Sequence, residues 1–243
     1  MAYMAPHNPA PLVPESPLVR TSIWFLFIAI SCLFFADIEI TTKDPWPEMK
    51  RLGAGLITPD FTKWEQILEA LLYTICFAIL GVTLANITGF LLAIVFHYRI
   101  VGIGCAFIRA VHELFWALIF LQIFGLTAVT GVLAIAIPYA GICAKVYAEI
   151  LEEADPSPLQ AVPNGTSVIS LFFFARLPGV WAHFKTYSLY RLECGLRSSA
   201  VLGFIGLPTI GFYLETAYKE GHYSDLSALL FVFYVVISTI RKW

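Results

Sequence analysis

The sequence predicts an all-α integral membrane protein with about six transmembrane helices. Its residues are 59% hydrophobic and only 13% charged, whereas a soluble domain usually carries about 25% charged residues. The apolar residues are gathered into runs of about 18 or more, the length at which a helix crosses a lipid bilayer. Polar, proline-containing segments separate these runs. The chain is therefore expected to cross a membrane repeatedly rather than to fold around one soluble core.

The N-terminal part predicts a flexible tail followed by an uncleaved first span. Residues 1–19 are rich in proline and alanine and lack helical periodicity, and residues 20–243 are assigned to one transmembrane domain. The first span covers about Ser22 to Ile40. We do not interpret it as a secretory signal, because no basic segment precedes its apolar run and no small-residue cleavage site follows.

Five further spans are predicted along the rest of the chain. A polar, turn-rich loop over residues 41–64 leads into a helix from Glu65 to about Tyr98, which exceeds the roughly 20 residues that a span needs. This helix must tilt or begin outside the bilayer. A proline in the fourth span predicts a kink, and a re-entrant or interfacial connection precedes the last span. The remaining spans cover about residues 102–124, 129–150, 171–206 and 228–240.

The basic residues favour a cytoplasmic N-terminus and a cytoplasmic C-terminus. Lys and Arg gather in the cytoplasmic loops of membrane proteins. The loop after the first span also carries basic residues, but acidic residues accompany them. In the favoured orientation the loop over residues 152–167 is cytoplasmic. The basic residues on its side are Arg20, Arg99, Lys145, Arg176, Arg241 and Lys242.

Two predicted spans carry charged residues, which are costly at mid-membrane and need a partner or a water-filled cavity. Arg109 and Glu113 are four residues apart, so on one helix they share a face and can pair. The charges of the two spans are also natural partners for each other. Two interpretations stay open: a polar pathway for an anion, or a structural network of ion pairs. The residues are Arg109, His112 and Glu113 in the third span, and Arg191, Glu193 and Arg197 in the fifth.

Other sequence signals exclude several classes of function. The net charge of −2 offers no basic surface for nucleic acid. The five cysteines have no CxxC spacing and are interpreted as apolar packing residues. No catalytic or metal-binding motif is found, and no GxxxxGK[ST] phosphate loop, so the chain has no ATPase site of that type. Asn86, inside the second span, is interpreted as a hydrogen-bonding residue between helices.

A short polar segment, EEADPSPLQAVPNGTS, interrupts the apolar sequence at residues 152–167. Its prolines restrict the backbone, and Asp155 is a suitable cap for a short helix that begins at Pro156. Leu159 and Val162 would give this helix a small apolar face for a partner. A second apolar run follows and contains Leu-Pro at residues 177 and 178.

This order resembles the cytoplasmic coupling loop of ABC-importer permeases. In that family Glu-Ala-Ala is followed by three residues, then glycine, then Leu-Pro further on. Here Gln160 takes the position of the glutamate, and the spacing to Gly165 is one residue shorter. The matching positions are Gln160, Ala161, Val162, Gly165, Leu177 and Pro178.

Longer segments are similar to the permease subunit of phosphonate-type importers, whose relatives carry phosphite or hypophosphite. They are IRAVHELFWALIFLQIFGLTAVTGVLAI, EEADPSPLQA and YSLYRLECGLRSSAVLGFIGLPTIG, and the similarity covers about residues 59–240. The resemblance implies a type I ABC importer permease fold in a bacterial inner membrane. It also implies a dimer with a second permease copy or paralogue, two ATPase subunits and a periplasmic substrate-binding protein. ATP and Mg would bind in the ATPase subunits, so the chain would need no cofactor and would not itself be an enzyme.

Residue roles follow as expectations. Residues 203–211, GFIGLPTIG, line a periplasmic gate or form a tight turn. The alternatives are an ABC importer permease for another small solute, such as an amino acid, and a membrane-embedded enzyme using the buried Arg, His and Glu residues. The residues expected to couple to the ATPase are Asp155, Leu159, Gln160, Ala161, Val162 and Gly165. Those expected along the translocation pathway are Arg109, Glu113, Arg191, Glu193 and Arg197.

Overall fold

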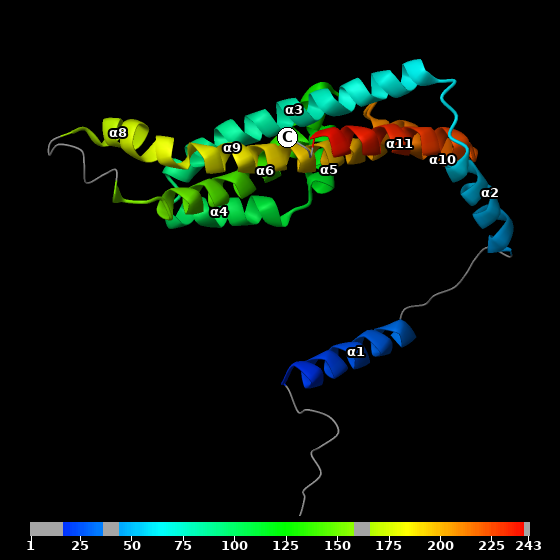
Figure 1. The fold of residues 1–243 in the computed structure, drawn as a ribbon, viewed down its shortest axis with the longest axis horizontal. Coiled ribbons are helices and arrows are strands. Elements are labelled where there is room, and N and C mark those ends of the chain that lie inside the picture. Colours follow the sequence, from blue (N-terminus) through cyan, green and yellow to red (C-terminus); the bar gives the residue numbers. More distant parts are fainter. Residues whose placement is uncertain (1–16, 36–43, 158–165, 241–243) are drawn as a thin grey trace, which may run out of the picture. The chain divides into compact units, whose positions relative to one another are not determined.

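The computed structural model describes residues 17–35, 44–157 and 166–240, and these ranges are helical without a strand (Figure 1). The chain divides into two compact units, residues 1–48 and 49–243. The first unit contributes α1, Pro17–Phe35, whose apolar side chains are not buried. This helix corresponds to most of the predicted first span. Of the predicted tail, only the last three residues are described, and they begin α1.

The second unit holds most of α2 and the described helices that follow it. Helix α2 begins at the end of the first unit. Short π-helical and 3-10 turns, η1 and η2, flank α9 at its two ends. The elements are α2 (Pro45–Ile57), α3 (Trp64–Ile94), α4 (Arg99–Ala110), α5 (Glu113–Phe124), α6 (Ala128–Glu152), α8 (Val168–Leu171), η1 (Phe172–Arg176), α9 (Leu177–Val201), η2 (Leu202–Ile205), α10 (Ile210–Glu220) and α11 (Tyr223–Ile240).

The predicted set of about six spans is confirmed in number when bent helix pairs are counted as single spans. Among the described residues, α1, α3, α6 and α11 are each long and apolar enough to cross a membrane. Two further pairs pass the same test together: α4 with α5, bent by 91°, and the segment of α9 with α10, bent by 51°. Length and composition thus support a multi-pass protein.

The predicted continuous span over residues 102–124 is wrong. Val111 has an extended backbone, and His112 starts a new helix because its Nδ1 accepts the N–H of Leu114. An extended residue followed by a side-chain cap ends one helix and begins another. The loop predicted over residues 41–64 is also partly wrong, since residues 45–57 form α2.

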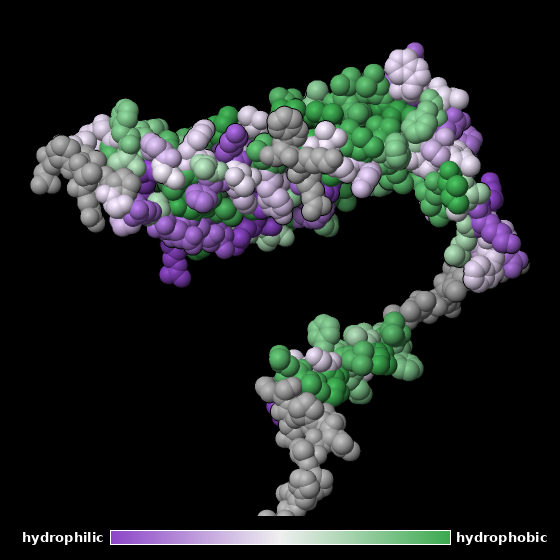
Figure 2. Space-filling view, viewed as in Figure 1, coloured by the Kyte–Doolittle hydropathy of each residue, from purple (hydrophilic) through white to green (hydrophobic). Residues whose placement is uncertain are grey.

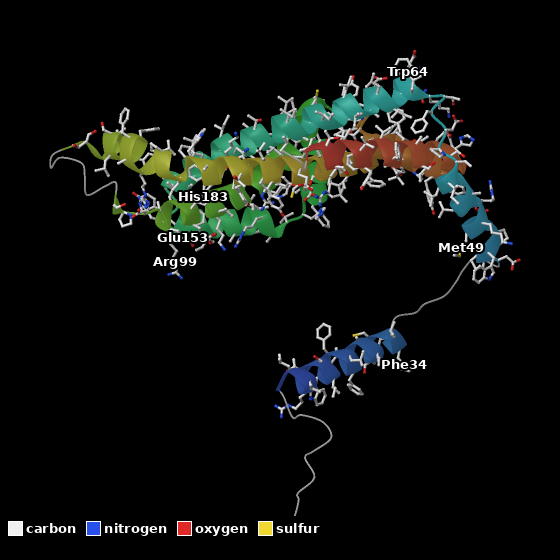
Figure 3. All side chains as sticks on the ribbon, in the orientation of Figure 1. Phe34, Met49, Trp64, Arg99, Glu153 and His183 are labelled. Carbon is white, nitrogen blue, oxygen red and sulfur yellow. The ribbon has the colours of Figure 1, made fainter. Side chains whose placement is uncertain are left out.

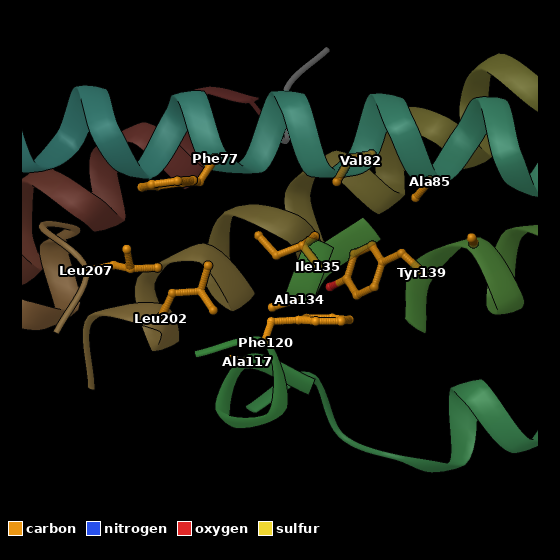
Figure 4. Packing of buried hydrophobic residues seen from close by; sticks show 11 residues of the cluster. Phe77, Val82, Ala85, Ala117, Phe120, Ala134, Ile135, Tyr139, Leu202 and Leu207 are labelled. Atoms are coloured by element: carbon orange, nitrogen blue, oxygen red, sulfur yellow. The ribbon is translucent and has the colours of Figure 1, made fainter. Parts of the chain in front are cut away.

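The packing of α3 against α6 forms the centre of the second unit. Phe77, Val82 and Ala85 of α3 face Ile135 and Tyr139 of α6 (Figure 4). The backbones approach closely where α3 carries glycine. A Cβ on Gly81 would lie 2.9 Å from the Cβ of Ile135, and one on Gly89 would lie 2.6 Å from the Cβ of Cys143. Small residues at such crossings are typical of helices packed in membranes.

Buried hydrogen bonds tie α3 to α9 and α10. The Ser199 hydroxyl donates to the carbonyl of Thr74 at 2.7 Å, and the Thr74 hydroxyl accepts the N–H of Ile210 at 2.9 Å. Between α9 and α10 the chain bends by 51° through η2 and Gly206, whose φ of 97° lies in the left-handed region that favours glycine. The predicted turn is present, with the N–H of Gly206 donating to the carbonyl of Gly203 at 2.9 Å, and the predicted gate role of residues 203–211 stays a prediction.

The two ends of the bundle differ in the residues they present. Trp64 lies at one end of α3, whereas Arg99, Glu153 and His183 gather at the other (Figure 3). At the Trp64 end the Lys63 ammonium pairs with Asp225 at 2.8 Å, and this contact raises the pKa of Lys63. Apolar side chains dominate the visible surface over α3, and polar residues gather where α4 lies (Figure 2). Glu153, near the start of the segment 152–167, thus lies at the end opposite Trp64.

Candidate functional site

Arg191 lies in the C-terminal half of α9, and its guanidinium is surrounded by three tyrosine rings. Its Nε and Nη2 both donate to the hydroxyl oxygen of Tyr187, at 2.8 Å and 2.6 Å. Its Cζ is 5.0 Å from the ring centre of Tyr187 and 5.6 Å from those of Tyr139 and Tyr190. We call these three residues the tyrosine cage. Their ring faces attract a cation without neutralising it.

Arg191 has no carboxylate partner in the part of the chain that the structure describes. Glu193 pairs instead with Arg197, four residues further along the same helix. Glu113 accepts a hydrogen bond from the Ser198 hydroxyl at 2.7 Å. A half-buried cation whose charge is not balanced is costly in a membrane protein. The tyrosine cage therefore offers a place where an anion would be stabilised.

A polar junction of three helices lies beside the cage. The Tyr147 hydroxyl of α6 donates to Asn86 Oδ1 of α3 at 3.0 Å and is 2.6 Å from the Ser188 hydroxyl of α9. All three residues line a largely apolar groove of about 560 Å³ between α3 and α9. The prediction that Asn86 hydrogen-bonds between helices is confirmed. Such bonds contribute about 0.6 kcal/mol each on average.

Glu113 belongs to a second polar chain, through Ser198 and Tyr139. Because the Ser198 hydroxyl donates to Glu113, it accepts from the Tyr139 hydroxyl, 2.8 Å away. The predicted pairing of Arg109 with Glu113 is wrong, since the helix break separates them and no ion pair joins them in the described structure. The charge pairs predicted between the third and fifth spans are not found among the described residues either. Glu113 contacts Ser198 of α9 instead.

The five predicted pathway residues therefore occupy different surroundings. The Glu113 carboxylate is linked to the Tyr139 hydroxyl through Ser198, and the Arg191 guanidinium lies over the Tyr139 ring. Arg109 is exposed, and Arg197 with Glu193 forms a pair on the flank of α9. Sequence reasoning missed the tyrosines. The available signal was the spacing of Tyr187 and Arg191, four residues apart on one helix.

Hydrogen bonds lie within the first described part of the segment 152–167 and between the residues that flank the segment. Asp155 accepts the N–H of Ser157 at 2.9 Å and its hydroxyl at 2.6 Å, and these bonds hold the pKa of Asp155 below its usual value. This contact fits the predicted cap. On the far side, Arg176 Nε and Nη2 donate to the carbonyl oxygen of Leu151 at 3.2 Å and 2.6 Å. The predicted coupling residues that lie outside the described residues are Leu159, Gln160, Ala161, Val162 and Gly165.

An apolar cluster joins the helices on both sides of this segment. Leu151 and Tyr147 of α6 pack with Val180 and Phe184 of α9 and with Ala93 of α3. The rings of Tyr147 and Phe184 meet edge to face, with centres 4.7 Å apart. Because this cluster is buried, the end of α6 and the beginning of α9 are expected to move as one body.

No family model matches the chain, but several transport permeases are similar to it. The phosphite transport system permease PtxC of Stutzerimonas stutzeri is 26% identical over 234 residues, covering 92% of this chain and 85% of that protein. The putative phosphite permease HtxC of the same organism is 28% identical over 213 residues, covering 79% and 76%. The phosphate-import permease PhnE of Mycolicibacterium smegmatis is 32% identical over 175 residues, covering 68% of this chain but only 33% of its own length.

One solved structure supports the fold. It is described as an amino acid ABC transporter with histidines, and it matches 76% of this chain and 95% of its own with a TM-score of 0.65 at 18% identity. The helical fold and the sequence relatives define the chain as a transmembrane permease subunit of an ABC transporter.

Within that class, the chain belongs with the permeases of phosphite and phosphonate transport systems. It is accordingly a multi-pass protein of a bacterial inner membrane. Its relatives are transport permeases rather than enzymes, so the interpretation as a membrane-embedded enzyme is dropped.

Proposed function

We propose that this permease carries an oxyanion of phosphorus, such as phosphite or a phosphonate, into the cell. The observation that carries the proposal is Arg191, a half-buried guanidinium without a carboxylate partner among the described residues. The names of the curated relatives support the same class of cargo. The pathway would pass the tyrosine cage and the flank of α9. Its residues are Arg109, Glu113, Arg191, Glu193 and Arg197.

The assembly we propose contains two permeases, this chain with a second copy or a paralogue. Two ATPase subunits, which bind ATP and Mg, would lie on the cytoplasmic side, and a binding protein would deliver the ligand from the other side. Both termini would be cytoplasmic. The segment 152–167 would dock on the ATPase through Asp155, Leu159, Gln160, Ala161, Val162 and Gly165.

Coupling would then be a rigid-body movement. Two features hold the end of α6 to the beginning of α9. One is the hydrogen bond from Arg176 to Leu151, and the other is the buried apolar cluster that includes Leu151 and Val180. A displacement of the docked segment would therefore move both helices together and change access to the pathway from one side to the other.

Uptake by the whole transporter tests which compound it carries. The chain, its ATPase and its binding protein are reconstituted in proteoliposomes, and accumulation of labelled phosphite, methylphosphonate, sulfate and glutamine is compared. We expect ATP-dependent, saturable uptake of a phosphorus oxyanion and no uptake of glutamine. Uptake of glutamine without uptake of any phosphorus compound would contradict the proposal.

A further inference from the structure

We infer that Tyr187 is a positioning residue that presents one particular edge of the Arg191 guanidinium to the transported oxyanion. The inference rests on the proposed function and deepens it. The guanidinium has two edges that each carry a pair of parallel N–H groups. The Tyr187 hydroxyl occupies the edge formed by Nε and Nη2. The other edge, formed by Nη1 and the second N–H of Nη2, has no hydrogen-bond partner within the described structure.

The free edge suits a ligand with two oxygens on one atom. Two parallel N–H groups bind carboxylate and phosphate-like anions in a bidentate way, which a single-atom anion such as chloride cannot reproduce. Nothing competes for this edge, because Glu193 is held by Arg197 and Glu113 by Ser198. The recognised class is therefore an oxyanion with at least two equivalent oxygens, as in phosphite or a phosphonate.

A tyrosine hydroxyl has an advantage over a carboxylate in this position. It fixes the direction of a long, flexible side chain but leaves the full positive charge available. A carboxylate would fix the direction too, yet it would neutralise the cation and compete with the cargo. The tyrosine rings lower the cost of the bare cation through their negative faces. The result is a moderate attraction, which a transport path needs if the ligand is also to leave.

The substitution Tyr187→Phe removes the hydroxyl but keeps the ring. Losing a hydrogen bond to a charged group lets the guanidinium rotate, and we expect phosphite transported per ATP hydrolysed to fall about tenfold. The control is Tyr234→Phe, which removes the same hydroxyl from a tyrosine of α11 that is 69% exposed and lies outside the tyrosine cage. The control is expected to stay within about twofold of the unmodified transporter. Stimulation of the ATPase by the binding protein should be unchanged in both variants.

A double-mutant cycle separates positioning from a structural role. If Tyr187 acts through Arg191, Tyr187→Phe should change transport less than about twofold in a chain that already carries Arg191→Gln. Equal effects in both backgrounds, or a normal rate for Tyr187→Phe alone, would overturn the inference. A transporter that never takes up phosphorus oxyanions, even unmodified, would instead refute the proposed function, so the two failures are distinguishable.

Discussion

Replacing Gly211 with alanine is expected to abolish the folded permease. Gly211 lies in the first turn of α10, where this helix passes the end of α9, and a Cβ at this position would overlap the carbonyl group of Ala200. Across the same contact, a Cβ on Gly203 would overlap the backbone of Gly211 and Phe212. Backbone atoms cannot rotate away as a side chain can. The added methyl group should therefore cost more than the about 1–3 kcal/mol of ordinary overpacking.

The measurement is the yield and thermal stability of the purified transporter. Gly104→Ala is the matched control, because a Cβ on Gly104 of α4 meets nothing within 4 Å. That change should be neutral or slightly stabilising, since alanine is favoured over glycine in a helix by about 1 kcal/mol. A Gly211→Ala permease that assembles at the normal yield and transports would show that the contact between α9 and α10 is not as close as described.

Replacing Arg176 with alanine is expected to uncouple ATP hydrolysis from transport. Arg176 holds the last turn of α6 to the start of α9 across the segment 152–167, through two hydrogen bonds to the carbonyl of Leu151. A hydrogen bond from a charged group contributes about 1.5–3 kcal/mol. Without it the two helices can separate when the segment is displaced. We expect the complex to assemble but to transport about tenfold less ligand per ATP.

The control for this variant is Arg99→Ala. Arg99 is exposed at the same end of the bundle (Figure 3) and makes no ion pair with the rest of the described chain. Both variants lose one positive charge, so a difference between them reports the Leu151 contact. Uptake and ATP hydrolysis are measured in the same proteoliposomes. An equal ratio of the two rates in both variants would count against the coupling role of Arg176.

The spans could be predicted because apolar length is visible in the sequence, whereas their breaks could not. Val111 and His112 interrupt an apolar run that contains no proline or glycine at that point. No local sequence signal therefore predicted the 91° bend. The ion pair of Arg109 with Glu113 was wrong for the same reason, because a spacing of four brings residues together only on an unbroken helix. Helix α2 was missed because its prolines and glycines suggested turns, although proline is tolerated in a first turn.

The candidate site was predicted in part. Arg191 and Glu113 stood out because charges are expensive in a membrane. Tyr139, Tyr187 and Ser198 did not, since each can equally serve as an ordinary helix residue, and only the fold brings α6 beside α9. The bond from Arg176 to Leu151 joins residues 25 positions apart, and a pattern search along the chain does not reveal such a pair.

The docking of the segment 152–167 on an ATPase is tested most directly by a cross-link. Gln160→Cys is introduced into a chain whose five native cysteines are replaced, and the ATPase carries single cysteines along the edge of its docking groove. We predict that oxidation joins the two subunits, stops ATP-driven uptake, and is reversed together with the block by a reductant. A transporter that remains fully active while residue 160 reacts only with an impermeant thiol reagent from the periplasmic side would contradict the proposed coupling.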